Sequence, residues 1–173
     1  MTYRLPALFA AGALAFAGAA MAAQAPNDAQ IAHIAYTAGA IDVEAAKQAL
    51  AKSQNAAVRE FASEMARDHA AVNDKALALV KELNVAPADN ATSQALSKAA
   101  AEKMKALAAL QGAEFDKAYV ANEVAFHKTV NGALESTLIP SAQNPQLKAL
   151  LETGATLFGE HQKHAEHLES ELD

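Results

Sequence analysis

The chain has 173 residues, of which 47 are alanine and none is cysteine or tryptophan; 52% are hydrophobic, 5% are aromatic, 20% are charged, and the net charge is −6. Because alanine is the strongest helix former and sheets are built from β-branched and aromatic residues, this composition argues against a β-rich fold and predicts an all-α protein. The acidic balance argues against nucleic-acid binding, since phosphate contacts need clustered Lys and Arg, and without cysteine there is neither a disulfide nor a thiolate ligand.

Residues 1–22 have the pattern of a secretory signal peptide. Arg4 provides a positive start, residues 5–20 are mostly apolar, and small residues surround the expected cleavage site after Ala22, with Ala23 as the alternative. This apolar run is rich in Ala and Gly and is short for a membrane span, so we expect no stable span after cleavage. The sequence therefore predicts one domain over residues 23–173, exported to the periplasm, and leaves peripheral association with the outer membrane open.

Five helices are expected from capping residues, helix breakers and apolar residues at three- and four-residue steps. They span about residues 28–52, 56–83, 92–110, 113–138 and 146–172. The first is expected to be capped by Asn27 or Asp28 and the third by Thr92 or Ser93, while Pro140 and Pro145 are expected to bracket a turn before the last helix.

The four long helices each carry one apolar stripe, and four such stripes bury one another best in a bundle. We therefore predict a ferritin-like four-helix bundle, in which two hairpins are joined by a long crossover at about residues 84–113 that carries the extra short helix. The sequence does not decide whether the outer face of that short helix is covered by a second copy of the chain in a homodimer. No envelope partner protein can be named.

Ionisable side chains interrupt the apolar stripe of each long helix. At 100° per residue, Asp42 lies about 40° from the centre of its stripe, and His69 lies about 40° from Met65. Burying such groups costs free energy unless they pair with one another or bind a metal. The candidate site residues are Asp42, His69, Asp116, Glu123, His127, His161 and, at the edge of its stripe, His164.

The heights of these groups along the bundle also agree. Glu123 and His161 are each 19 residues from the turn near residue 142, so they fall at the same level on antiparallel helices. Asp42 is about 12 residues and His69 about 15 residues from the turn near residue 53, a mismatch of about one helical turn, or 5.4 Å. We expect one site near the middle of the bundle.

Three functions stay open for such a site. The groups can satisfy one another by hydrogen bonds, with Tyr119 beside Glu123, in a non-catalytic envelope or stress-associated protein, which the sequence favours slightly. Alternatively, imidazoles and a carboxylate hold a transition metal ion (Zn, Fe, Mn or Cu) in a metal-binding or metal-buffering protein. A ferritin-like oxidase is the third, weakened because no Glu is followed by His three residues later. No catalytic residue is assigned.

Three segments, residues 55–69, 110–127 and 145–161, resemble a large bacterial family of exported, ferritin-like proteins of unknown function, domain-of-unknown-function family 4142. An Asp-His pair, a Phe-Asp-x-x-Tyr motif and a late His carry the resemblance. Members are often labelled predicted outer membrane or periplasmic proteins. The resemblance implies a ferritin-like fold and an envelope location, without an established activity, and its motif positions here are His69, Asp116, Tyr119, His127 and His161.

Overall fold

The computed structural model describes residues 25–172, and every element of regular structure in that range is helical, which confirms the all-α fold class. The expected signal peptide and its cleavage site lie outside the described residues. The elements are α1 (Asp28–Lys52), α2 (Ala56–Glu82), α3 (Ala91–Ala108), α4 (Gly112–Ala133), the π-helical turn η1 (Leu134–Leu138), the short α5 (Ile139–Ser141) and α6 (Pro145–Leu172).

Asparagine side chains begin the first three helices. Asn27 caps α1, as expected, and Asn55 caps α2. The cap expected for α3 at Thr92 or Ser93 is wrong, because the side chain of Asn90 accepts hydrogen bonds from both of their backbone N–H groups. Ser93 instead completes a capping box by accepting from the backbone N–H of Asn90, which satisfies a further exposed donor at the helix start.

The fourth long helix continues further than expected. It runs through η1 and α5 to Ser141, past the predicted end near residue 138 and past Pro140. In η1 the backbone N–H of Ile139 donates to the carbonyl of Leu134, five residues earlier. A proline ring clashes with the carbonyl of the preceding helical turn, and the wider π turn relieves that conflict, so the helix accommodates Pro140 before ending.

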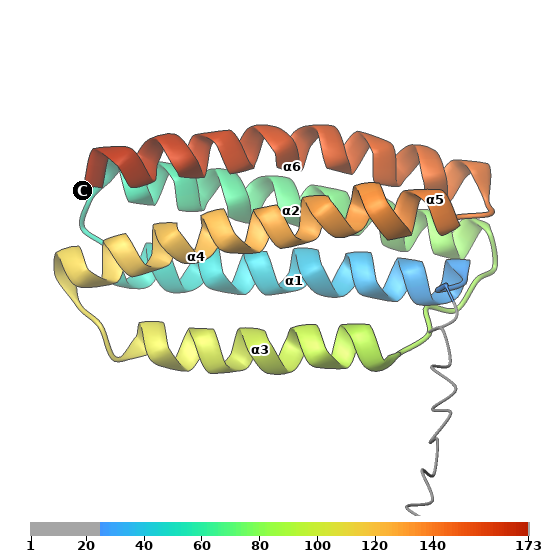
Figure 1. The fold of residues 1–173 in the computed structure, drawn as a ribbon, viewed down its shortest axis with the longest axis horizontal. Coiled ribbons are helices and arrows are strands. Elements are labelled where there is room, and N and C mark those ends of the chain that lie inside the picture. The colour runs from blue at the N-terminus through green and yellow to red at the C-terminus, as the bar shows by residue number, and fades with distance from the viewer. Residues whose placement is uncertain (1–24, 173) are drawn as a thin grey trace, which may run out of the picture.

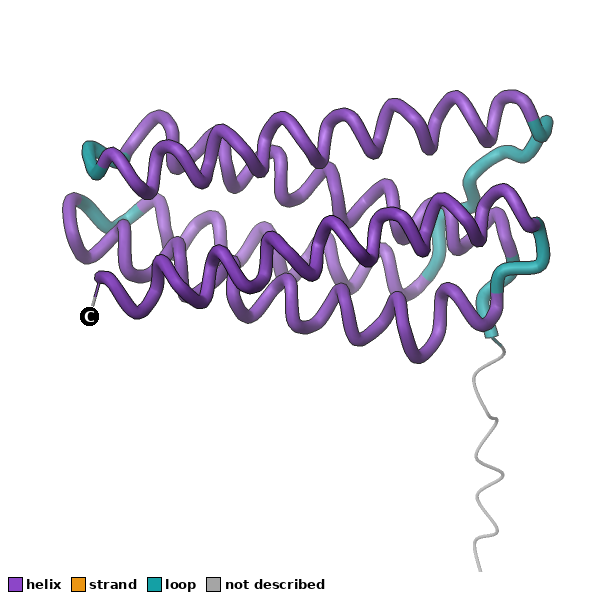
Figure 2. Tube along the Cα trace, turned by 90° about the horizontal axis from the view of Figure 1, so that it is seen from above, coloured by secondary structure: helices purple, strands orange, loops and turns teal. Residues whose placement is uncertain are grey.

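The long helices form two antiparallel hairpins, α1 with α2 and α4 with α6, and α3 lies in the connection between them (Figure 1). Viewed from above, the helices run nearly along one common axis (Figure 2). The α3 helix packs outside α1 and in the same direction, and both of its ends are tied to α1. The backbone N–H of Ala88 donates to Ala29 O at 2.9 Å, and Lys52 Nζ donates to Ala108 O at 2.8 Å. The predicted long crossover is therefore present.

The buried apolar side chains form two separate clusters along the bundle. One, which we call the aromatic half, surrounds Phe61, Phe115 and Tyr119 near the turn between α1 and α2. The other, the aliphatic half, lies toward the turn between α5 and α6. It comprises Ile31, Ile34, Leu134, Leu138, Ala142, Leu147, Leu151 and Phe158. The buried side chains of Asp42, His69, Glu123, His127 and His161 lie between the two.

Candidate metal centre

Five ionisable side chains from all four long helices meet between the aromatic and aliphatic halves, as the helical positions predicted. We call this group the histidine layer. Each member is at most 3% exposed. The layer consists of Asp42 from α1, His69 from α2, Glu123 and His127 from α4, and His161 from α6.

The distances within the layer bring possible ligand atoms together in two groups of three that share His127. His69 Nε2 lies 3.4 Å and His127 Nε2 lies 3.6 Å from the same oxygen, Asp42 Oδ2. Ligand atoms of His69, His127 and His161 all lie within 4.8 Å of one another, and so do ligand atoms of Asp42, Glu123 and His127. Ligands at about 2.0–2.2 Å from one metal ion are themselves about 3–4 Å apart, so these atoms need only small movements to surround an ion.

A backbone hydrogen bond fixes the tautomer of His127. Its Nδ1 lies 3.0 Å from the carbonyl oxygen of Glu123, one turn earlier on α4, and because that oxygen can only accept, Nδ1 carries the proton. In a neutral imidazole the other nitrogen then keeps its lone pair. Nε2 of His127 is buried, faces Asp42 and has no hydrogen-bond partner. This pattern is typical of a metal-ligating histidine.

Asp68, the first residue of the Asp-His pair but not among the predicted ligands, orients His161. Its Oδ2 lies 3.2 Å from His161 Nε2, so this nitrogen donates and Nδ1 keeps a lone pair that is buried without a partner. The carboxylate is held in turn by Arg67, whose Nε donates to Oδ1 at 2.6 Å. The adjacent Asp68-His69 pair was the available signal: one residue turns a helix by 100°, so Asp68 faces α6 while His69 faces the layer.

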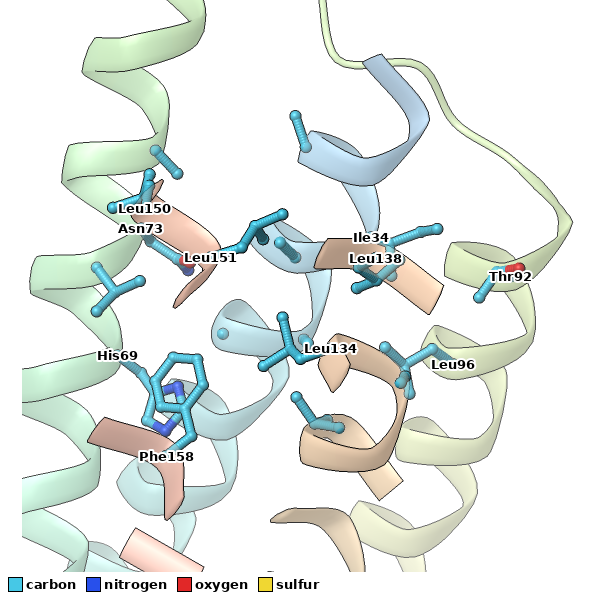
Figure 3. Close-up of a pocket in the computed structure, with 18 of the residues that line it drawn as sticks. Ile34, His69, Asn73, Thr92, Leu96, Leu134, Leu138, Leu150, Leu151 and Phe158 are labelled. Carbon is cyan, nitrogen blue, oxygen red and sulfur yellow. The ribbon is translucent and has the colours of Figure 1, made fainter. Parts of the chain in front are cut away.

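The ring of His69 is positioned by stacking, with neither nitrogen hydrogen-bonded. It lies parallel to Phe158, with ring centroids 4.5 Å apart and planes 5° apart. Beyond it, a cavity of about 140 Å³ extends into the aliphatic half. Figure 3 shows His69 and Phe158 on one side of this cavity, with Ile34, Leu134 and Leu138 across from them. The layer is therefore open to an apolar space on one side.

Burial keeps the imidazoles uncharged. It lowers the pKa of His69 to about 2, helped by repulsion from His127 and His161, and the pKa of His127 to about 4. The pKa of His161 is also lowered by burial, against the opposing hydrogen bond to Asp68. The contacts between these rings and carboxylates inside the layer are therefore not ion pairs at neutral pH.

Burial shifts the pKa values of the carboxyl groups in the opposite direction, upward. Burial raises the pKa of Asp42 to about 7, and burial together with the nearby Asp42 raises the pKa of Glu123 well above its usual value. Both effects reflect the lack of a compensating positive charge among the surrounding protein groups. A divalent cation would supply two positive charges and favour the ionised form of both acids.

Two of the predicted ligands lie outside the layer, and one predicted hydrogen bond is not formed. Asp116 is buried two helical turns from Glu123, and it is in none of the groups of three ligands that the described residues form. His164 lies outside the layer, with Nδ1 2.8 Å from Glu64 Oε2. The hydroxyl of Tyr119 has no hydrogen-bond partner, so the network expected between it and Glu123 is not formed.

The sequence pattern of a family described as "Domain of unknown function (DUF4142)" matches residues 13–168. The chain belongs to the DUF4142 family. This confirms the resemblance inferred from the sequence motifs, and no curated protein matches the chain.

One solved structure has a fold similar to that of this DUF4142 chain. It is described as a proposed secreted protein of family DUF305 from Streptomyces coelicolor, and the two agree with a TM-score of 0.69 over 83% of this chain and 91% of that one. They share 12% sequence identity, so the likeness concerns the fold alone. In the DUF4142 chain, none of the helices within residues 25–172 is long and apolar enough to cross a membrane.

Proposed function

We propose that this DUF4142 protein binds one divalent transition-metal ion in the histidine layer and serves as a metal-binding or metal-buffering protein. The observation that carries the proposal is the set of buried, unpartnered lone pairs that converge there. They belong to the unprotonated nitrogen of the neutral His69, to His127 Nε2, to His161 Nδ1 and to both oxygens of Asp42. Within each group of three, the ligand atoms lie within 4.8 Å of one another, close enough for a bound ion to draw them together.

The same observation disfavours a purely structural network, which the sequence alone favoured slightly. Buried polar groups that only fix the register of a bundle are hydrogen-bonded, since an unsatisfied buried donor or acceptor costs about 1–3 kcal/mol. Here Asp42 meets two imidazoles at 3.4 and 3.6 Å without a hydrogen bond to either. A shared cation would satisfy all of these atoms together.

The ligand chemistry narrows the choice of ion. Imidazole suits zinc, copper, iron and nickel, and a carboxylate also suits manganese, whereas the soft thiolates that select Cu(I) are missing from a chain without cysteine. Asp42 and Glu123 together would balance the charge of a divalent ion. The di-iron pattern of four glutamates and two histidines does not match a layer of two carboxylates and three imidazoles, so we do not propose an oxidase.

We further propose that the protein acts in the periplasm. The signal-peptide pattern of residues 1–22 supports export, and the structural relative from Streptomyces coelicolor is itself described as a proposed secreted protein. Peripheral association with the outer membrane remains an alternative location. A buffering protein in that compartment would meet metal ions before they reach the cytoplasm.

The test is metal content and metal affinity of untagged protein purified from the periplasm. We expect about one equivalent of metal by elemental analysis, and calorimetric binding of Zn²⁺ or Fe²⁺ by the metal-free protein. His127→Gln should abolish stoichiometric binding, while His167→Gln, which changes an imidazole that is 71% exposed, should not. Asp42→Asn, nearly equal in volume to the native residue, provides a second layer variant, and circular dichroism checks that each variant is folded. A folded wild type that binds none of Zn²⁺, Fe²⁺, Mn²⁺ and Cu²⁺ would end the proposal.

A further inference from the structure

A second cluster of ligand groups lies just outside the histidine layer, where α2 packs against α6. We call Glu64, Asp68, His161 and His164 the outer cluster. Ligand atoms of Glu64, Asp68 and His161 lie within 4.8 Å of one another, and His164 Nδ1 is 2.8 Å from Glu64 Oε2. Side-chain exposure rises from 2% at His161 to 17% at Asp68, 33% at Glu64 and 43% at His164. The cluster thus leads from the buried layer to the solvent.

His161 belongs to both clusters, and this makes the path continuous. It shares one group of three with His69 and His127, and another with Glu64 and Asp68. His127 in turn links the three imidazoles to Asp42 and Glu123. These three overlapping groups form a chain of ligands from the surface to the centre. His161 is also buried with an unpartnered Nδ1, so it has a free lone pair at the junction.

We propose that the outer cluster is the entry site through which a divalent cation reaches the histidine layer. This inference rests on the proposed metal-binding function and adds its route. Glu64 and His164 capture the hydrated ion at the surface, Asp68 takes it inward, and His161 transfers it to the other two imidazoles. Each step exchanges one oxygen or nitrogen ligand for another, so the ion is never left without ligands in the low-dielectric interior.

Arg67 opposes this entry. Its guanidinium donates to both oxygens of Asp68, at 2.6 Å to Oδ1 and 3.0 Å to Oδ2, and its side chain is 69% exposed. An incoming cation must therefore displace Arg67 from Asp68. Removing Glu64 and removing Arg67 are consequently expected to change the rate of metal uptake in opposite directions.

The experiment is stopped-flow uptake of Zn²⁺ by the metal-free protein, followed with a zinc-sensitive dye. We expect Glu64→Gln combined with His164→Gln to slow uptake about 10-fold, within the range that charged clefts contribute to association rates, with the final stoichiometry unchanged. Arg67→Gln should accelerate uptake. The control is Glu166→Gln, which removes a carboxylate from α6, the helix of His164, that pairs with Lys128 of α4 and lies outside the outer cluster.

Each result tests a different part of the proposal. Uptake by the Glu64→Gln/His164→Gln variant at the rate of Glu166→Gln would overturn the entry site while leaving the metal proposal intact. Slower uptake after Arg67→Gln would equally contradict the route through Asp68. A wild type that takes up no zinc and none of the other three ions contradicts the proposed function itself, so the two failures are distinguishable.

The cavity in the aliphatic half carries a second, independent inference. It measures about 140 Å³, and its lining is mostly aliphatic or aromatic, with His69, Asn73, Thr92, His127 and Thr129 as the polar members. Figure 3 shows His69 beside Phe158 at the edge of this cavity. An apolar cavity of about 150 Å³ lined by such side chains stays dry and binds benzene or xenon. We infer that this cavity takes one small uncharged apolar molecule, of benzene size or below, which would then lie against the imidazoles.

Thermal unfolding with and without benzene, together with xenon-129 NMR, tests this inference without any metal present. We expect both probes to bind the wild-type protein, and benzene to raise its unfolding temperature. Ala38→Leu, which adds bulk to the cavity wall, should remove both effects, whereas Ala95→Leu on the exposed face of α3 should retain them. A wild type that responds to neither probe would overturn the cavity as a binding site.

Discussion

The two halves of the core differ in how they support the histidine layer. In the aromatic half, Phe61, Phe115 and Tyr119 are completely buried. The Tyr119 ring is stacked on Phe115 with centroids 6.1 Å apart and is edge-on to Phe61 with centroids 6.3 Å apart. The aliphatic half contains the cavity and ends at the π turn η1. One side of the layer is thus backed by large fixed rings, and the other by a space with smaller side chains.

This difference indicates what each half contributes to the site. A metal site needs ligands held in place by their surroundings, and in the aromatic half Tyr119, one turn before Glu123 on α4, is completely buried and packed against two other rings. The open side allows His69 and Phe158 room to adjust when an ion or an apolar guest arrives. The predictions below test this division, starting with the largest effect.

Truncating a side chain should cost more in the aromatic half than in the aliphatic half. We expect Phe61→Ala to lower the free energy of unfolding by about 3–5 kcal/mol, because it leaves a large cavity among rigid neighbours. Leu151→Ala should cost about 2–3 kcal/mol, since a side chain that lines an existing cavity has already lost contacts on that side. Urea unfolding at constant m-value measures both. A larger loss for Leu151→Ala would contradict the contrast.

Asp42→Asn in the layer should change the stability of the protein in opposite directions with and without bound metal. With free metal at 100 times its dissociation constant, the wild type gains about 2.7 kcal/mol, and Asp42→Asn should lose this gain. In the metal-free protein the same change removes a buried acid that has no hydrogen-bond partner, so stability should stay level or rise. Thermal unfolding with chelator and with Zn²⁺ measures both. Equal losses in the two conditions would indicate a structural role only.

A close helix contact beside the cavity gives the next prediction. A Cβ atom on Gly39 of α1 would overlap the side-chain oxygen of Asn73 on α2. Gly39→Ala should therefore destabilise the protein by about 1–3 kcal/mol. In a double-mutant cycle, Asn73→Ala should recover most of this loss because it removes the overlapping atoms. Additive losses would show that the two positions do not compete for the same space.

The helices and the histidine layer could be predicted from the sequence because both depend on periodicity. The helical wheel placed Asp42, His69 and His127 on buried faces, and counting from the turn placed Glu123 level with His161. The remaining mismatch of about one turn between Asp42 and His69 is removed in the fold, where their side chains come within 3.4 Å.

Other features depend on contacts between several helices, so the periodicity of a single helix could not predict them. Asp68 was not predicted as a site residue, because it lies 100° around the helix from His69; α2 packs against both α1 and α6, so two of its faces are covered. Pro140 signals a helix end, but the π turn of η1 accommodates it. The cavity reflects the summed volumes of side chains from five helices, which no local pattern encodes.

The smallest effect, and the most specific to the layer, is the pH dependence of stability. Asp42 has a folded-state pKa of about 7 against an ordinary value of 3.8, so the folded protein holds more protons between these values. Its contribution to stability is complete below pH 3.8 and is lost as the pH rises through about 7. His69 and His127 act in the opposite sense, because their lowered pKa values give a contribution that is complete well above pH 6.5 and is lost as the pH falls toward about 2 and about 4, respectively.

Between about pH 7.5 and 8.5 the histidines of the layer are largely neutral in the unfolded chain as well, so their contributions change little and the carboxyl groups of the layer should dominate its effect on stability. We expect the metal-free protein to lose stability with rising pH in this window, with a slope of at most about 1.4 kcal/mol per pH unit for each proton released. The metal-bound protein should gain stability over the same window, because the ion binds the ionised carboxylates and displaces their protons. Asp42→Asn should flatten both trends. Thermal unfolding across this pH range, with chelator and with Zn²⁺, compares them directly, and parallel curves in the two conditions would show that no ion binds to these carboxylates.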